Sequence, residues 1–375
     1  MSRTEEILAK RLAGGRVDAD EALHLAAEAD LFALGRAANS LRRKHVPSDT
    51  ATYLVDRNIN YTNVCITDCK FCNFYRPVGD VEAYVLPKDV LAQKISETVQ
   101  AGGTRILMQG GHNPALRLPW YEDLLRWIKA AFPSIEIDAF SPSEISHLAT
   151  LEGMSVREVL QRLKAAGLEG LPGGGAEILD DEVRQEIAPK KLDTAGWLGV
   201  MREAQALGLV TSASMVTGCG ETARHRVNHL LRIRELQDEA LASHGNGFPS
   251  FIPWTMQVET TAMGKIFEVK KLLPASAQDY LANLALCRVV LDNIPHLASS
   301  WPTQGEKVAQ AALAFGADDF GSTMLEENVV SAAGTVRVKM DADEIRHHIR
   351  TAGWVPAQRD SRYNILKRFE QEAAA

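Results

Sequence analysis

The chain has 375 residues, 46% of them hydrophobic and 24% charged, which is the balance of a globular protein with a large core. A net charge of −7 does not suggest a nucleic-acid surface, and no apolar run is long enough for a membrane span. Five cysteines, three of them clustered, and an N-terminus without a signal peptide's apolar core predict a protein of the reducing cytoplasm.

Residues 1–50 are expected to form an N-terminal helical cap on the main domain. Apolar residues recur there at helical spacing, and Gly14 and Gly15 separate the first helix from the second. No residue in this stretch indicates chemistry.

From about Tyr53 the pattern changes to short apolar runs that alternate with helical segments, which is typical of parallel strands. One of the helices starts with a capping box, Ser155 and Glu158, and stops at Gly167. Eight such units across residues 51–325 predict an α/β fold, a (β/α)8 barrel of the TIM type. The expected strands span residues 58–64, 105–109, 135–140, 168–171, 210–216, 250–256, 297–301 and 319–324.

The stretch DRNINYTNVCITDCKFCNFYR, at and after the first expected strand, carries Cys65, Cys69 and Cys72 at C-x3-C-x2-C spacing. Three close thiolates can hold one face of a four-iron cluster, which leaves one iron open. An open metal position is where a substrate or cofactor can coordinate. The alternatives are a zinc site, for which no fourth ligand follows nearby, and inert or disulfide-bonded thiols.

Polar or glycine-rich runs recur where the other strands should end. In a (β/α)8 barrel these ends meet on one face, and active sites collect there. Their succession favours one shared site rather than ordinary loops. The runs are QGGHNP (109–114), SPSE (141–144), PGGGAE (172–177), TGCGET (217–222), WTMQVET (254–260), WPTQG (301–305) and STMLEEN (322–328).

The cysteine spacing, with an aromatic residue before the third cysteine, resembles the signature of the radical S-adenosylmethionine (radical SAM) superfamily. Longer strings are similar to the cyclic dehypoxanthine futalosine synthases of menaquinone biosynthesis, over nearly the whole chain. They include DRNINYTNVC, CKFCNFYR, QGGHNP, AFSPSEI, LPGGGAEIL, FIPWTMQ, WPTQG and DFGSTMLEENVVSAAG. The resemblance implies a radical SAM barrel with a [4Fe–4S] cluster and S-adenosyl-L-methionine (SAM), and an electron donor such as flavodoxin or ferredoxin.

The implied small-molecule substrate is dehypoxanthine futalosine, a ribose joined through a ketone-bearing chain to a benzoate ring. A 5′-deoxyadenosyl radical takes hydrogen from ribose C4′, the carbon radical adds to the ring, and loss of an electron and a proton restores aromaticity. Enzymes similar to aminofutalosine synthase, or to those that make the deazaflavin FO, are the alternatives within the superfamily. A non-catalytic metal-binding scaffold or sensor is the alternative outside it.

The resemblance also assigns cofactor roles. The three cysteines would ligate the cluster, and Phe71 would pack near the SAM adenine, unless it is a core ring. Gln109, Gly110 and Gly111 would offer backbone groups to the amino end of SAM, unless they are turn residues.

The ribose hydroxyls of SAM would need hydrogen-bond partners, and two further residues are candidates for this role. Glu177 in PGGGAE is the first, with a surface-loop carboxylate as the alternative. Ser141 is a weaker candidate for the same pocket.

Because the cyclisation ends in deprotonation, a base is expected. Glu326 and Glu327, within the family-like EEN, are candidates, with helix-start carboxylates as the alternative. His112 is a third candidate, with a lone structural histidine as the alternative.

Residues 326–375 are expected to form a small C-terminal extension that packs on the barrel. It should be partly extended up to residue 340, helical from Asp341 to Ala352, and solvated in its tail. Three features depart from the family pattern: Asn73 stands where alanine is usual, Cys219 in TGCGET where many relatives carry histidine, and QVETT (257–261) replaces a commoner QPENT-like run. The last two lie in the expected substrate region and leave the substrate open.

Overall fold

A computed structural model describes residues 1–46 and 49–370. Residues 47–48, at the end of the predicted cap, and 371–375, at the end of the predicted tail, lie outside the described residues.

Within the described residues, ten strand segments build the barrel, and all of their pairings with one another are parallel. A one-residue break at Val55 divides the first strand, and one at Ser212 divides the fifth, so the ten segments act as eight strands. The segments are β1 (Thr50–Leu54), β2 (Asp56–Ile59), β3 (Arg105–Met108), β4 (Glu136–Ala139), β5 (Gly170–Leu171), β6 (Val210–Thr211), β7 (Ala213–Thr217), β8 (Ser250–Thr255), β9 (His296–Leu297) and β10 (Asp319–Ser322).

The sheet closes on itself, which confirms the predicted barrel. The hydrogen-bonded orders are β10-β1, β2-β3-β4-β5-β6 and β7-β8-β9, and the two bent strands join them. Ala298 bridges to Asp319 and so connects β9 with β10. The first strand begins at Thr50, well before the predicted start, and ends at Ile59. The residues after it leave the sheet because Thr62 pairs with Val85 in an isolated antiparallel bridge.

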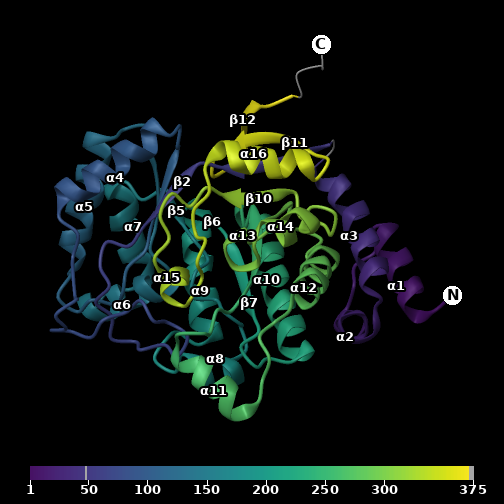
Figure 1. Cartoon of the computed structure of the whole chain (residues 1–375). Coiled ribbons are helices and arrows are strands. Elements are labelled where there is room, and N and C mark those ends of the chain that lie inside the picture. Colours follow the sequence, from purple (N-terminus) through teal and green to yellow (C-terminus); the bar gives the residue numbers. More distant parts are fainter. Residues whose placement is uncertain (47–48, 371–375) are drawn as a thin grey trace.

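Helices cover the outside of the barrel (Figure 1). The capping box at Ser155 and the left-handed Gly167 bound one of them, as predicted. The helices that follow the barrel strands are α4 (Lys88–Gln100), α5 (Leu118–Ala131), α6 (Pro142–Glu152), α7 (Val156–Ala166), α8 (Asp181–Ile187), α9 (Thr194–Ala206), α10 (Ala223–His244), α11 (Ala262–Lys270), α12 (Ala277–Val290), α13 (Trp301–Gln304) and α14 (Glu306–Ala312).

Three N-terminal helices lie against the side of the barrel: α1 (Arg3–Leu12), α2 (Ala19–Glu28) and α3 (Leu31–His45). The longest, α3, packs on α12. Arg11 in α1 is buried, and its Nε donates to the carbonyl of Val289 in α12 at 2.8 Å.

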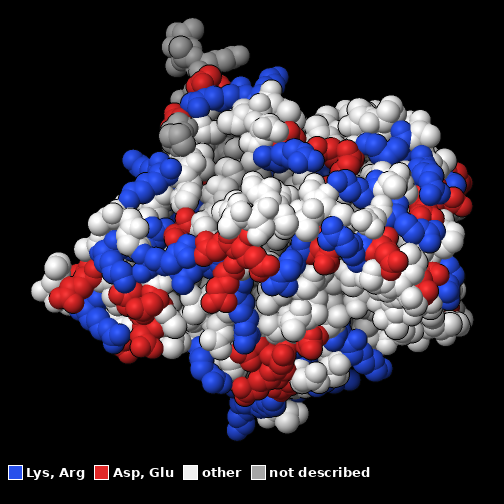
Figure 2. Space-filling model, turned by 180° about the vertical axis from the view of Figure 1, so that it is seen from behind, with Lys and Arg blue, Asp and Glu red and all other residues white. Residues whose placement is uncertain are grey.

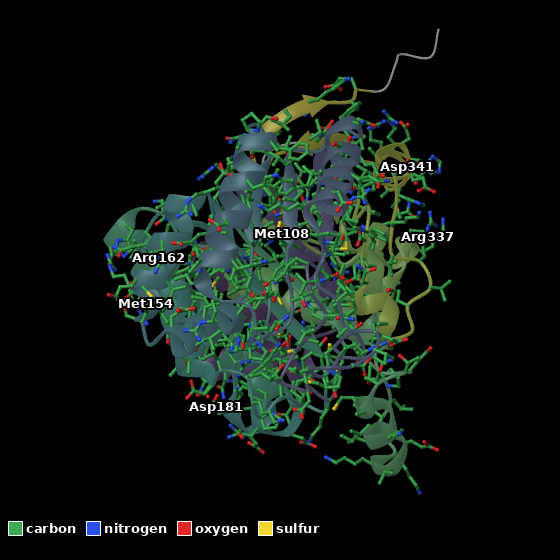
Figure 3. All side chains as sticks on the ribbon, turned by 90° about the vertical axis from the view of Figure 1, so that its left-hand side faces the viewer. Met108, Met154, Arg162, Asp181, Arg337 and Asp341 are labelled. Atoms are coloured by element: carbon green, nitrogen blue, oxygen red, sulfur yellow. The ribbon has the colours of Figure 1, made fainter. Side chains whose placement is uncertain are left out.

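The two faces of each barrel strand differ in what they contact. In β3, Ile106 and Met108 are fully buried against the helices, and Figure 3 shows Met108 deep in the molecule. The alternate residues Arg105, Leu107 and Gln109 face the barrel interior and stay partly accessible. Side chains therefore do not fill the barrel interior, and a space lined by these inward-facing residues remains inside it.

Charged side chains of both signs are mixed over the outer face seen in Figure 2. Several form surface ion pairs, such as Arg202 with Glu239 at 2.6 Å. Across residues 1–46 and 49–370, no helix has the length and apolar character needed to cross a bilayer.

The C-terminal residues differ most from the prediction. The segment 326–340 contains a short helix, α15 (Val329–Ala332), and α16 (Ala342–Thr351) follows as predicted. The tail from Gln358 on was predicted to be a solvated end packed by a few apolar residues. The residues of β12 (Ile365–Arg368) are indeed exposed, but the chain also forms β11 (Val355–Arg359), which was not predicted. That strand is stabilised by a distant partner, since it pairs in parallel with β1. Figure 1 shows α16, β11 and β12 together at one end of the molecule, opposite α8 and α11.

A buried ion pair anchors this segment under the barrel. Arg359 Nη2 donates to Asp319 Oδ1 at 3.1 Å, and Thr52 Oγ1 donates to Asp319 Oδ2 at 2.6 Å. Beside it, the Tyr363 ring stacks on the ring of His296 with centroids 3.8 Å apart. The C-terminal segment therefore closes the end of the barrel where the strands begin.

We expect Arg359→Met to lower the free energy of unfolding by about 3–5 kcal/mol, because it leaves the buried carboxylate of Asp319 without its cation. Denaturant unfolding of the purified protein measures this. Arg362→Met is the matched control, since Arg362 is exposed. Equal losses in the two variants would contradict the assignment.

Candidate active site

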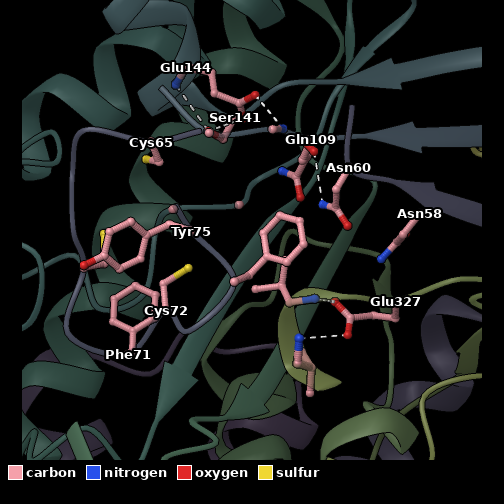
Figure 4. A pocket seen from close by; sticks show the side chains of 18 of the residues that line it. Asn58, Asn60, Cys65, Phe71, Cys72, Tyr75, Gln109, Ser141, Glu144 and Glu327 are labelled. Carbon is pink, nitrogen blue, oxygen red and sulfur yellow. Dashed lines mark hydrogen bonds between the residues drawn. The ribbon is translucent and has the colours of Figure 1, made fainter. Parts of the chain in front are cut away.

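A cavity of about 330 Å³ lies at the ends of the strands where the polar runs were predicted to meet. The long loop after β2 forms one wall, and the turns after β3, β4, β5, β9 and β10, together with side chains of β8, line the other sides (Figure 4). Of the residues predicted to act in the site, those that line the cavity are Cys65, Cys69, Cys72, Phe71, Gln109, Gly110, Gly111, His112, Ser141, Glu177 and Glu327.

The cysteine loop is held by backbone hydrogen bonds. Cys65 N–H donates to the carbonyl of Arg76 at 3.0 Å, and Cys72 N–H donates to the carbonyl of Cys69 at 3.0 Å. The backbone N–H of His112 donates to Cys65 Sγ at 3.3 Å. Burial raises the pKa of the Cys69 thiol to about 11, so without a metal it holds its proton. Metal binding at these residues would release that proton.

Two glycines allow the turn after β3 to approach this loop. A Cβ on Gly111 would lie 2.1 Å from the carbonyl oxygen of Val64 and 2.7 Å from Cys65 Cβ. A Cβ on Gly110 would lie 2.6 Å from the Tyr61 ring. Close packing against the cysteine loop and Tyr61 therefore requires glycine at both positions, whether or not a cofactor is bound.

Glu177 is part of a buried ion pair. Its Oε1 accepts from Lys191 Nζ at 2.9 Å, and the same Nζ lies 5.3 Å from the centre of the Phe71 ring. Burial acts to lower the pKa of Lys191, but Glu177 and then Cys69 raise it above its ordinary value. The sequence prediction missed Lys191, because nothing in the Lys190-Lys191 pair shows which side chain turns inward.

Ser141 binds another buried carboxylate. Its Oγ donates to Glu144 Oε2 at 2.8 Å, while Glu144 Oε1 accepts from the Tyr61 hydroxyl at 2.6 Å and from Gly110 N–H at 3.0 Å. Burial raises the pKa of Glu144 to about 7. Glu144 thus joins the turns after β3 and β4, a role that its place in SPSE did not reveal.

The carboxylates of Glu326 and Glu327 lie in different surroundings. Glu327 lines the cavity, and its carboxylate accepts the N–H groups of Val329 at 3.0 Å and Val330 at 2.8 Å. Burial raises its pKa, although these hydrogen bonds act against the rise. Glu326 is not among the residues that line the cavity; its carboxylate pairs with Lys94 and, at 3.4 Å, with Arg57.

His112 has its ring stacked on the ring of His147, with centroids 5.0 Å apart. Burial, followed by the neighbouring His147 and Lys191, lowers the pKa of His112 to about 3. The ring is therefore neutral at physiological pH.

The three departures from the family pattern lie outside the cavity lining. Asn73 Nδ2 donates to the carbonyl of Ala332 in α15 at 3.0 Å. Cys219 is buried, with its Sγ 3.3 Å from Glu221 Oε2, and Val258 is buried in the core.

Comparisons with known proteins show the family of this chain. The family model of the radical SAM superfamily matches residues 59–233, and that of the CofH/MqnC C-terminal region matches residues 245–372. This chain is 45% identical to cyclic dehypoxanthine futalosine synthase of Halalkalibacterium halodurans, over 98% of this chain and 96% of that relative. The chain belongs to the radical SAM enzymes of the CofH/MqnC family.

A second relative of this radical SAM enzyme is cyclic dehypoxanthine futalosine synthase of Streptomyces coelicolor, 42% identical over 96% of this chain and 88% of the relative. Among solved structures, HydG, a maturase of the [FeFe]-hydrogenase, superposes with a TM-score of 0.73 at 14% identity. The match covers 95% of this chain and 76% of HydG. This last likeness concerns the fold alone.

The buried Glu144 predicts a pH dependence of stability in this radical SAM enzyme. Its pKa of about 7 in the folded state is above the usual value, so its contribution is complete below about pH 4.5 and is lost as pH rises through 7. Between pH 5 and pH 8, wild type should therefore lose up to about 3 kcal/mol of unfolding free energy relative to Glu144→Gln.

Denaturant unfolding at both pH values checks this. Glu152→Gln, on the same helix, is the control with the opposite sign, because Leu118 N–H and Arg117 lower the pKa of Glu152. Parallel pH profiles for wild type and Glu144→Gln would contradict the prediction.

Proposed function

We propose that this protein converts dehypoxanthine futalosine to cyclic dehypoxanthine futalosine, using a [4Fe–4S] cluster and SAM. The observation that carries the proposal is the 45% identity along 98% of the chain to a relative with this activity. The position of Asn73, Cys219 and Val258 supports it, since none of these departures lines the cavity.

The arrangement of the cysteines supports a cluster rather than one zinc ion. Zinc binds thiolates at about 2.3 Å, which places ligand sulfurs about 4 Å apart. Within the described part of the chain, only Asp180, Glu182 and His225 bring three ligand atoms within 4.8 Å of one another. The three cysteine sulfurs are therefore spread more widely than one ion would hold them, although all line one cavity.

In this proposal Cys65, Cys69 and Cys72 hold the cluster and leave one iron free for SAM. When bound, the two cofactors supply a 5′-deoxyadenosyl radical that abstracts hydrogen from the substrate. A flavodoxin or ferredoxin supplies the electron, and the reaction takes place in the cytoplasm, where thiols are kept reduced.

The chain's own groups position SAM. The N–H groups of Gly110 and Gly111 already donate to Glu144 and to the carbonyl of Thr62. The carbonyls of Gln109 and Gly111 also have partners, in Asn60 Nδ2 and Asn113 N–H, so among the described contacts the Gly110 carbonyl remains for the amino end of SAM, which needs acceptors.

Neighbouring residues would bind the adenine and the ribose of SAM. Phe71 covers the adenine, and Glu177 and Ser141 face the ribose hydroxyls. Because Lys191 already binds Glu177, it holds that carboxylate in one orientation.

Anaerobic assay tests the function. Reconstituted protein with SAM, a reductant and dehypoxanthine futalosine should give the cyclic product, and substrate deuterated at ribose C4′ should transfer its label to 5′-deoxyadenosine. Cys65→Ala should abolish both and lower the iron content, whereas Cys287→Ala, a buried free cysteine outside the cavity, should keep both.

Rapid SAM cleavage by wild type without cyclic product would contradict the cyclase assignment. Product formed instead from an enol ether substrate would indicate an aminofutalosine synthase-like enzyme. Zinc in place of about four irons per chain would indicate the scaffold alternative.

The proposed base for the final deprotonation is Glu327, because it is the acidic residue of the EEN run that reaches the cavity. Glu327→Gln should lower the ratio of cyclic product to 5′-deoxyadenosine at least about tenfold, since hydrogen abstraction comes before proton loss. The ratio also separates this role from a general loss of folded enzyme.

Glu326→Gln is the matched control. It changes the neighbouring carboxylate, which pairs with Lys94 away from the cavity, and should leave the product ratio within about twofold of wild type. If only Glu326→Gln lowers the product ratio, Glu326 and not Glu327 is the base. If neither variant lowers the ratio, His112 is the next candidate.

A further inference from the structure

Lys191 is the only lysine or arginine among the described residues that line the cavity. The acidic side chains of the same lining are Glu144, Glu177 and Glu327. A four-iron cluster held by three cysteines would add negative charge, because cysteine binds iron as the thiolate. The single cation of the lining therefore stands in a cavity where negative charge is in excess.

The ammonium group of Lys191 is close both to a carboxylate and to the cysteine loop. Its Nζ donates to Glu177 Oε1 at 2.9 Å and lies 5.3 Å from the centre of the Phe71 ring, directly before Cys72 in sequence. Burial raises the pKa of the Cys69 thiol, and Lys191 opposes that rise more strongly than any other group. Glu177, of opposite charge, acts on the same thiol less strongly than Lys191. The positive charge is thus felt at the cysteines despite its carboxylate partner.

Burial distinguishes Lys191 from the lysine next to it. The side chain of Lys191 is 16% exposed, whereas that of Lys190 is 57% exposed. Lys190 also contacts the cysteine loop, since its Nζ pairs with Asp68 at 2.6 Å. Water screens a charge at the surface, whereas a buried charge acts through a medium of lower dielectric constant. Of these two cations beside the loop, only Lys191 acts strongly on charge inside the cavity.

We propose that Lys191 raises the reduction potential of the cluster at the three cysteines. Reduction adds one electron from the donor protein to the cluster, and no bond forms or breaks in that step. The added negative charge is stabilised by a buried cation nearby, and net charge is one of the factors that set the potential of an iron–sulfur cluster. This inference rests on the cluster of the proposed function, but not on the identity of the substrate.

The test is a redox titration of cluster-loaded protein without SAM or substrate, using dithionite, mediator dyes and the EPR signal of the reduced cluster. At the midpoint potential of wild type, the ratio of reduced to oxidised cluster should fall about tenfold in Lys191→Met, which is a shift of about 59 mV to more negative potential. Lys191→Arg keeps the charge and should stay within about threefold of wild type. Glu177→Gln removes the neighbouring anion and should raise the ratio.

Lys190→Met is the matched control, because it removes the adjacent but exposed cation, and its ratio should stay within about twofold of wild type. In Lys191→Met, Arg184 Nη1 remains 3.6 Å from Glu177 Oε2, so the buried carboxylate keeps one cation beside it. If this variant does not load a cluster, the double variant Lys191→Met with Glu177→Gln is compared with Glu177→Gln alone. The same tenfold fall is expected, since the two proteins differ only in the cation.

A ratio in Lys191→Met within twofold of wild type would overturn the proposal. So would an equal fall in Lys190→Met, or in Lys191→Arg, since the effect would then not come from a buried charge. Failure of the proposed function shows differently: wild type would hold the cluster and give the titration, but would form no cyclic product. A wild type that holds no cluster after anaerobic reconstitution would contradict both.

Discussion

The close approach of the turn after β3 to the cysteine loop is the contact on which the site depends. The backbone of Gly111 lies so near Val64 that no side chain fits between them, and His112 N–H reaches the sulfur of Cys65. Glu144 fixes the same turn from the other side by accepting from Gly110 and Tyr61. The cysteines therefore face the barrel interior because the loop that carries them is packed against a rigid strand end.

Local patterns made part of this structure predictable. The cysteine spacing, the capping box at Ser155 and the polar runs at strand ends depend on residues that are close in sequence, so the sequence alone reveals them. The inward position of Lys191 beside Glu177 depends on a contact between separate turns, so neighbouring Lys190 looked equivalent. Glu326 and Glu327 are separated by one distant and one local contact: Lys94 on α4 pairs with Glu326, whereas Glu327 accepts the N–H groups that begin α15, as a helix-start carboxylate does.

The tail was mispredicted for a related reason. Residues 355–359 contain a proline and two polar side chains, which on their own favour a solvated end. Their strand exists because β1 offers an open edge and because Asp319 requires a cation.

The pairing of β1 with β10 and β11 also determines when this protein can finish folding. The strand that begins at Thr50 must wait for partners that the ribosome makes roughly 270–300 residues later. Until then, one barrel edge stays open, and the apolar faces of the early strands are exposed to solvent and to other chains. Closure of the barrel is accordingly a step that follows release of the full-length polypeptide, and C-terminal truncation would leave β1 without β11 and the barrel edge exposed to aggregation.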